Sequence, residues 1–213
     1  MTKPEIAQAA VAALKTEYPD AVCSLVSRSP LELLIATRLS AQCTDARVNL
    51  VTPALFARFP DLDAFCAASA AEIAPYIRSC GLYQTKARDI YAMCCAIRDR
   101  FGGEVPHTLD DLTSLPGVGR KTANLIMGDV YGAPAVVADT HCIRINNRLG
   151  LCDSKDPLKV ERQLRALLPP AESNAYCHRM VLHGRAVCDA RKPACSRCCM
   201  ASFCPRVGVT TAE

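Results

Sequence analysis

The stretch Leu115-Pro116-Gly117-Val118-Gly119-Arg120-Lys121-Thr122-Ala123 lies between two predicted helices, over about 109–114 and 120–131. Two glycines one residue apart permit positive φ angles and close approach of the backbone. The amides of Val118 and Gly119, with the N-terminus of the second helix, can therefore face a phosphate oxygen. The spacing is not that of a Walker loop, which excludes a nucleoside-triphosphatase. The stretch is either a tight helix–helix turn or a phosphate-binding hairpin.

Helix start and stop signals dominate the rest of the chain. Capping residues, first-turn prolines and closing glycines mark helices over about 30–42, after Thr44-Asp45, after Ser69-Ala70-Ala71-Glu72, over 86–101 and after Asp156-Pro157. No run alternates with a period of two, so a sheet-based fold is not expected. The sequence predicts an all-α protein of nine or ten helices, without repeats or a Gly/Ser linker.

Composition and charge narrow the class of protein. Half of the 213 residues are hydrophobic and 22% are charged, which excludes a disordered or low-complexity chain. The net charge of +4 is too small to show a nucleic-acid partner by itself, but residues 178–213 carry six cationic side chains against two anionic ones. The apolar patch at 9–14 is too short for a signal peptide or a membrane span. We therefore expect a location without membrane contact, in a compartment that keeps thiols reduced.

Lys121 and Asp139 are the candidate reactive groups. Lys121 falls in the first turn of a helix beside Arg120, where the helix dipole and a neighbouring cation disfavour protonation of its amine. Such a lysine can act as a nucleophile. Asp139, in Val136-Val137-Ala138-Asp139-Thr140-His141, falls at a predicted N-cap whose amides keep it ionised. An attacking amine and a carboxylate that stabilises cationic charge suit cleavage of a glycosidic bond, whereas a phosphate-binding lysine and a plain helix cap are the simpler alternatives.

Four cysteines close together predict a metal site. Cys188-x6-Cys195-x2-Cys198-x5-Cys204 lies in a loop-like segment, and its spacing suits either a structural zinc ion or an iron–sulfur cluster. Cys199 would change the spacings and is left out. Arg191 and Lys192 would present positive charge to phosphates from this loop. The other ten cysteines are expected to be small core side chains.

The string Leu115–Ala123 closely resembles the helix-hairpin-helix of DNA glycosylases. With Asp139 and the cysteine spacing, nearly the whole chain is similar to the endonuclease III family, bifunctional DNA glycosylases and abasic-site lyases of base excision repair. The resemblance implies that Lys121 and Asp139 are catalytic. It also implies that Cys188, Cys195, Cys198 and Cys204 hold a 4Fe-4S cluster rather than zinc.

The same resemblance implies a fold and a set of DNA contacts. The fold would be all-α, with two helical domains flanking a DNA-binding cleft: a six-helix barrel at 23–133 carrying the helix-hairpin-helix at about 109–131, and a discontinuous cluster domain of 1–22 plus 134–213. Gln42 would fill the gap left in the duplex, and Leu82 would be an apolar wedge. The expected DNA contacts are Gln42, Leu82, Gly117, Val118, Gly119, Arg120, His141, Arg191 and Lys192.

The implied reaction begins with extrusion of a damaged nucleotide from the stack. Lys121 then attacks C1′, and the Schiff base is followed by β-elimination of the 3′ phosphate. The expected partner is double-stranded DNA containing damaged pyrimidines or abasic sites, bound by a monomer in the bacterial cytoplasm at the nucleoid. If Lys121 is not the nucleophile, the N-terminal amine and Lys86 are the next amines to consider.

Three other functions stay open. A mismatch or pyrimidine-dimer glycosylase of the same superfamily would differ only in the shape of its base pocket. The adenine-specific mismatch glycosylases lack the lysine and carry a further C-terminal domain. A cluster-bearing protein that binds DNA without catalysis, or that senses redox state, is the alternative from another class.

Overall fold

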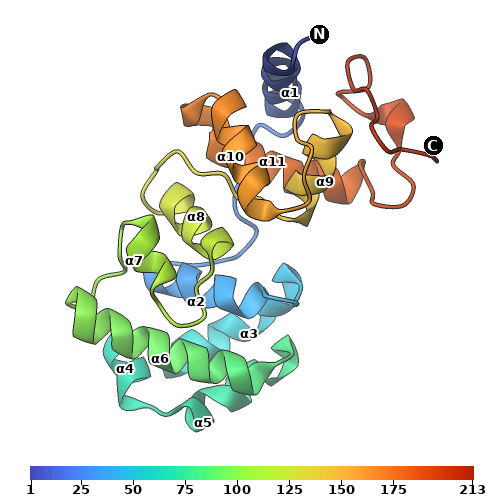
Figure 1. Cartoon of the computed structure of the whole chain (residues 1–213). Helices are drawn as coiled ribbons and strands as arrows, with labels where there is room; N and C mark the ends of the chain where they lie inside the picture. The colour runs from blue at the N-terminus through green and yellow to red at the C-terminus, as the bar shows by residue number, and fades with distance from the viewer. The chain divides into compact units, whose positions relative to one another are not determined.

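The computed structural model describes residues 1–213, which form helices, turns and loops without any strand (Figure 1). The predicted all-α fold is confirmed, with eleven α-helices and three short 3₁₀-helices in place of the nine or ten helices expected. The chain divides into two compact units. We call residues Cys23–Tyr131 the hairpin unit, and Met1–Val22 with Gly132–Glu213 the cysteine unit. The sequence placed this boundary two residues later, after 133.

The hairpin unit is built around α2. Its elements are α2 (Pro30–Ser40), α3 (Asp45–Arg58), α4 (Leu62–Ala67), α5 (Ala70–Ile73), the 3₁₀-helix η1 (Ala74–Cys80), α6 (Tyr83–Phe101), α7 (Leu109–Thr113) and α8 (Arg120–Asp129). Seven of the eleven residues of α2 are buried, because α3, α6 and α8 all pack against it. The helices α4 and α5 and the helix η1 pack against α6. The hairpin α7–α8 is thus joined through α2 to the rest of this unit.

The predicted helix caps of this unit are confirmed at atomic detail. The side chains of Ser29, Ser69 and Thr108 each accept a hydrogen bond from the amide three residues on, and Ser69 forms a full capping box with Glu72. Gly102 ends α6 in the left-handed region, at φ +62°. The predicted ends were less accurate: α2 stops at residue 40 rather than 42, and α8 at 129 rather than 131.

The cysteine unit contains α1 (Lys3–Glu17), α9 (Thr140–Arg148), α10 (Pro157–Leu167), η2 (Pro170–Glu172), α11 (Ser173–Ala186) and η3 (Cys195–Arg197). Both α1 and α9 pack against α11, so a helix from the start of the chain completes a core formed by its second half. Glu172 reinforces this arrangement by pairing with Lys15 and with Arg179, and these two cations lower the pKa of its carboxyl group. None of the helices combines the length and apolar character that crossing a bilayer requires.

Candidate functional site

The hairpin between α7 and α8 is held by buried apolar side chains and by one glycine. Leu112, Leu115 and Val118 are at most 6% exposed. Gly117 has φ +73°, and a Cβ added there would lie 2.8 Å from both Arg38 Nε and Asp89 Cβ. Arg38 and Asp89 form an ion pair beneath the turn, with Nε 2.9 Å from Oδ2. Gly117 is therefore required both by its backbone conformation and by lack of space.

Gly119 does not use the positive φ angle that a glycine permits. Its backbone is extended, at φ −92° and ψ 171°, and it is the N-cap of α8 without any capping side-chain bond. A Cβ at this position would meet nothing within 4 Å, so Gly119 faces open space. The Val118 amide, also expected to face a phosphate, donates instead to the Leu115 carbonyl at 3.1 Å. The first-turn amides of α8 are consequently the groups that this hairpin offers to an anion.

Lys121 lies in the first turn of α8, one residue after Arg120, and both side chains are exposed. The opposite side of α8 is fixed in the core by Ala123, Leu125 and Ile126, which are at most 8% exposed. The helix therefore presents an accessible primary amine directly beyond the hairpin turn. This combination can bring a nucleophile to an atom beside a bound phosphate.

Asp139 is the N-cap of α9 in the cysteine unit. It follows a buried segment, residues 135–138, and its Oδ1 accepts a hydrogen bond from the Cys142 amide at 2.7 Å. The predicted cap is confirmed. His141, an expected DNA contact, is partly buried: its Nδ1 lies 3.1 Å from Arg144 Nη2, and a Cβ on Gly184 of α11 would overlap its ring. Asp139 thus has a fixed orientation, and His141 is packed into the same helix junction.

Gln42 and Leu82 share an unusual backbone conformation. Their φ angles are +55° and +48°, and both residues are exposed, Leu82 by 63%. L-residues other than Gly, Asn and Asp seldom occupy this left-handed region, and such strained positions cluster at functional sites. Gln42 follows the end of α2, and Leu82 is the N-cap of α6. Local sequence gave no signal for either conformation.

Lys86 is not an accessible amine. It is 1% exposed, and its Nζ donates to the carbonyls of Leu39 and Cys80 at 2.8 and 2.6 Å. The expectation that Lys86 could replace Lys121 as nucleophile is therefore wrong, because its lone pair would become available only after a buried ammonium lost two hydrogen bonds.

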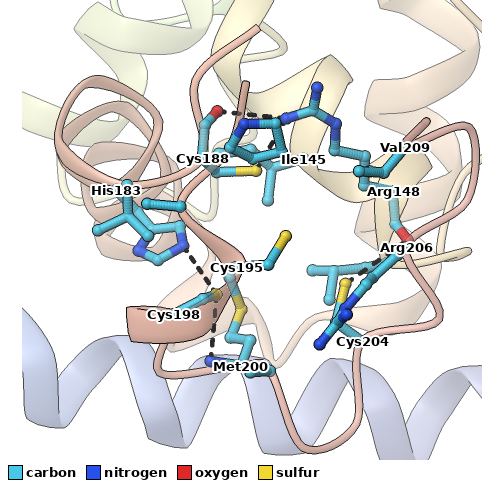
Figure 2. Close-up of a pocket in the computed structure, with 15 residues that line it drawn as sticks. Ile145, Arg148, His183, Cys188, Cys195, Cys198, Met200, Cys204, Arg206 and Val209 are labelled. Carbon is cyan, nitrogen blue, oxygen red and sulfur yellow. Dashed lines mark hydrogen bonds between the residues drawn. The ribbon is translucent and has the colours of Figure 1, made fainter. Parts of the chain in front are cut away.

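The four predicted cysteine ligands meet around one pocket in the cysteine unit (Figure 2). Cys188, Cys195, Cys198 and Cys204 all line it, together with apolar side chains that include Ile145, Met200 and Val209. Cys199 is not among the lining residues. None of the fourteen cysteines forms a disulfide. The pocket therefore gathers the four cysteines that the spacing singled out.

Two arginines of α9 fix the first of these cysteines. Arg148 Nη1 lies 3.1 Å from Cys188 Sγ and donates to the Asp189 carbonyl at 2.7 Å. Arg144 Nη2 donates to the Cys188 carbonyl at 2.8 Å. Because Asp139 caps the other end of the same nine-residue helix, α9 connects the cysteine pocket to the candidate carboxylate.

The thiols of the neighbouring residues Cys198 and Cys199 differ in the direction of their pKa shifts. The pKa of Cys198 is lowered to about 4, first by a hydrogen bond from the Cys199 thiol and then by His183, whose Nε2 lies 3.3 Å from Cys198 Sγ. The same hydrogen bond, with burial, raises the pKa of Cys199. Since the thiolate is the form that binds metals, Cys198 rather than Cys199 suits a ligand.

The four thiols surround a space, and no group of three or more His, Cys, Asp or Glu side chains is arranged to hold a single metal ion. A tetrahedral zinc site needs its four sulfurs about 2.3 Å from one point. Four cysteine thiolates are also the ligand set of iron–sulfur clusters, so the residues around the pocket fit either kind of group by their chemistry.

The exposed surface of the cysteine loop is basic. Arg191 and Lys192 are exposed, and their amides donate to Asp189 Oδ1 at 2.8 and 3.2 Å, which fixes the turn that carries them. Lys192 Nζ lies 3.3 Å from a carboxylate oxygen of Glu213, and both side chains are more than half exposed. An exposed pair of this kind contributes little to stability, so Lys192 can turn toward another anion.

The prediction for the other ten cysteines is correct for half of them. Cys80, Cys94, Cys142, Cys152 and Cys177 are buried. The remaining five are partly exposed: Cys23, Cys43, Cys66, Cys95 and Cys199.

Comparison with known proteins identifies the family. The profile of the HhH-GPD superfamily of base excision DNA repair proteins matches residues 35–170. Endonuclease III of Synechocystis sp. is 47% identical over 193 residues, which cover 90% of this chain and 88% of the relative. Endonuclease III of Bacillus subtilis is 43% identical over 188 residues, which cover 88% of this chain and 86% of that relative.

Solved structures give the same result. A trapped endonuclease III–DNA covalent intermediate matches with a TM-score of 0.90 at 43% identity, over 97% of each chain. A thermostable thymine-DNA glycosylase shares the fold, with a TM-score of 0.84 at 21% identity over 94% of this chain and 95% of that one. The chain therefore belongs to the endonuclease III family, within the HhH-GPD superfamily of base excision DNA repair proteins.

Proposed function

We propose that this protein is a bifunctional DNA glycosylase and abasic-site lyase of base excision repair, acting on duplex DNA through Lys121. The observation that carries the proposal is the exposed Lys121 amine in the first turn of α8, directly after the open N-cap Gly119. The relatives named endonuclease III, one of them trapped as a covalent DNA intermediate, support a reaction in which the protein bonds to DNA.

The chemistry follows from an amine and a carboxylate. The Lys121 amine forms a bond to C1′ of the extruded nucleotide while the glycosidic C–N bond breaks and the base leaves with a proton. The ionised Asp139 stabilises the positive charge that develops on the sugar. The sugar ring opens to an imine, loss of a C2′ proton then breaks the C3′–O bond, and the strand is cleaved on the 3′ side of the lesion.

The remaining expected residues bind the duplex. Arg120 and the first-turn amides of α8, including that of Gly119, contact phosphates, as do Arg191 and Lys192. Gln42 fills the space that the extruded nucleotide vacates, and Leu82 is the apolar wedge. The preferred substrates are damaged pyrimidines and abasic sites, and the protein acts as a monomer in the cytoplasm at the nucleoid.

The cysteine pocket holds a 4Fe-4S cluster through Cys188, Cys195, Cys198 and Cys204. The support is the gathering of these four thiols around one apolar pocket and the thiolate character of Cys198. When bound, the cluster supplies structural cross-links that order the loop carrying Arg191 and Lys192.

Single-turnover assays on a panel of lesions test the proposal. The panel contains oxidised pyrimidines, a thymine mismatch, an adenine mismatch, a pyrimidine dimer and an abasic site, each in a duplex, with and without borohydride. We expect excision and a borohydride-trapped adduct with oxidised pyrimidines, and trapping without prior excision at the abasic site.

Lys121→Gln retains length and polarity but removes the amine, so it should abolish trapping and strand cleavage while duplex binding persists. Arg120→Gln is the matched control: it loses a neighbouring charge, weakens binding and still traps. Parental protein that binds the lesions but neither excises nor traps would instead identify a non-catalytic DNA-binding protein, and activity confined to mismatches or dimers would redirect the substrate assignment.

A further inference from the structure

Lys86 is a buried cation that the proposed reaction does not use. It lies on α6 and is 1% exposed, although a lysine is almost never fully buried without compensation. Burial lowers the pKa of its amine. Its ammonium is compensated by two main-chain carbonyls, those of Leu39 and Cys80. A group this costly to bury must hold something that would otherwise be displaced.

The two carbonyls belong to different segments. Leu39 is in the last turn of α2, and Cys80 is the last residue of η1, so both are the unpaired carbonyls of a helix end that a cation stabilises. Gln42 follows three residues after Leu39, and Leu82 follows two residues after Cys80. The backbone amide of Lys86 also donates to the Leu82 carbonyl, at 3.0 Å. One residue thus contacts both segments that turn left-handed.

A second contact joins the same two segments. The pKa of the Cys80 thiol is raised to about 11, first by burial and then by the Cys43 thiol, which is hydrogen-bonded to it. Cys43 is the residue directly after Gln42. Two independent contacts therefore hold the Gln42 loop and the Leu82 loop at a fixed separation.

We propose that Lys86 is the positioning residue that holds the Gln42 and Leu82 loops together, so that both side chains act at the same lesion in the duplex. This inference rests on the proposed function, in which Gln42 fills the vacated space and Leu82 is the apolar wedge. A gap-filling side chain and an apolar wedge from separate loops can act at one lesion only if the loops keep a fixed spacing. Leu82 has no side-chain cap of its own, and Lys86 binds the helix end that precedes each of the two left-handed residues.

The test uses two substrates, of which only the duplex requires extrusion of a nucleotide. Lys86→Met retains the buried stem but removes the donor, and single-turnover rates are measured at saturating protein on an oxidised pyrimidine in duplex DNA and on an abasic single strand. We expect the duplex rate to fall by about 10- to 100-fold, the size of a displacement of about 1 Å in a site, and the single-strand rate to stay within about twofold of parental. Equal losses on both substrates would show a merely structural role and overturn the proposal.

Two further measurements keep the result decisive. Lys86→Gln retains a donor on a shorter stem and should recover part of the duplex rate. If Lys86→Met does not fold, the same two substrates are used to compare Lys86→Gln with the parental protein. In a double-mutant cycle, Lys86→Gln should cost little on duplex DNA once Leu82→Ala has removed the wedge, because both changes disable one step. Additive losses would overturn the proposal. Failure of the parental protein on both substrates would contradict the proposed function instead, so the two failures are distinguishable.

Discussion

The hairpin at residues 109–131 and the cysteine loop at residues 187–207 both carry basic side chains. The two regions differ in the contacts that hold them in place. The hairpin joins two helices, and three buried apolar side chains with Gly117 fix its turn. The cysteine loop contains only the three-residue helix η3, and its first cysteine is held by donors from Arg144 and Arg148. Buried apolar packing therefore holds the hairpin, whereas the cysteine loop is held by polar contacts and, in the proposed function, by the cluster. This contrast predicts that metal removal will disorder the cysteine loop and leave the hairpin ordered.

Loss of the cluster should have the largest effect. Purified protein should contain about four irons per chain, and Cys195→Ser should lose the iron, the order of the cysteine loop and most of the DNA affinity, because binding of such a group is coupled to local folding. Hydrogen exchange would measure this: amide protection should fall across residues 187–207 and persist across 109–131. Cys199→Ser, which changes a thiol outside the pocket, is the control and should retain its iron. Stoichiometric zinc in protein prepared without oxygen from iron-replete cells would contradict the assignment.

Asp139→Asn should have the next largest effect, and a purely chemical one. Asn retains the N-cap of α9, so the melting temperature should hardly change. Removing the charge that stabilises the cationic sugar should slow base excision by about 10²- to 10³-fold. Cleavage at a pre-formed abasic site should suffer less, since no glycosidic bond has to break. Equal losses in the two single-turnover rates would assign Asp139 to strand cleavage or to structure.

The two hairpin glycines provide a matched pair of smaller effects. Gly117→Ala places a methyl group 2.8 Å from Arg38 and Asp89 at a φ angle of +73°, and should lower the free energy of unfolding by about 1–3 kcal/mol. Thermal or denaturant unfolding of the two variants measures the difference. Gly119→Ala meets open space and should leave the unfolding free energy within about 0.5 kcal/mol.

The DNA affinity of Gly119→Ala gives the complementary result. A methyl group beside the first-turn amides of α8 should obstruct the phosphate and weaken duplex binding by on the order of tenfold, about 1.4 kcal/mol. If the alanine binds duplex DNA as tightly as the parental protein, the hairpin amides are not a phosphate site.

The smallest expected effect concerns the salt dependence of binding. Each neutralised phosphate contributes about −0.9 to the slope of log affinity against log salt, so Arg191→Gln with Lys192→Gln should flatten the slope by at most about 1.8. Titration of undamaged duplex at several salt concentrations measures this. An unchanged slope would place the DNA contacts away from the cysteine loop.

Sequence patterns predicted the features that depend on side chains close together in the sequence. The caps at Ser29, Thr108 and Asp139 and the gathering of four spaced cysteines follow from side chains near in sequence. The α1 capping box of Thr2 and Glu5 is a local signal of the same kind, and it begins a helix that the predicted set did not include. The helix α11 begins without a side-chain cap, so its start carried no signal.

Other features depend on contacts distant in sequence. The space below Gly117 is filled by Arg38 and Asp89, which come from two other helices. The left-handed turns at Gln42 and Leu82 and the burial of Lys86 arise where α2, η1 and α6 meet, and no local pattern encodes that meeting. The family resemblance supplied Gln42 and Leu82, but it gave no account of what holds them.

The central claim is that the Lys121 amine forms the covalent bond to DNA. The most direct measurement is to trap the parental protein on an abasic duplex with borohydride, digest the adduct with protease and nuclease, and locate the modified residue by mass spectrometry. The account predicts one modified peptide, with the deoxyribose remnant on Lys121. A remnant on the N-terminal amine or on any other lysine would contradict it.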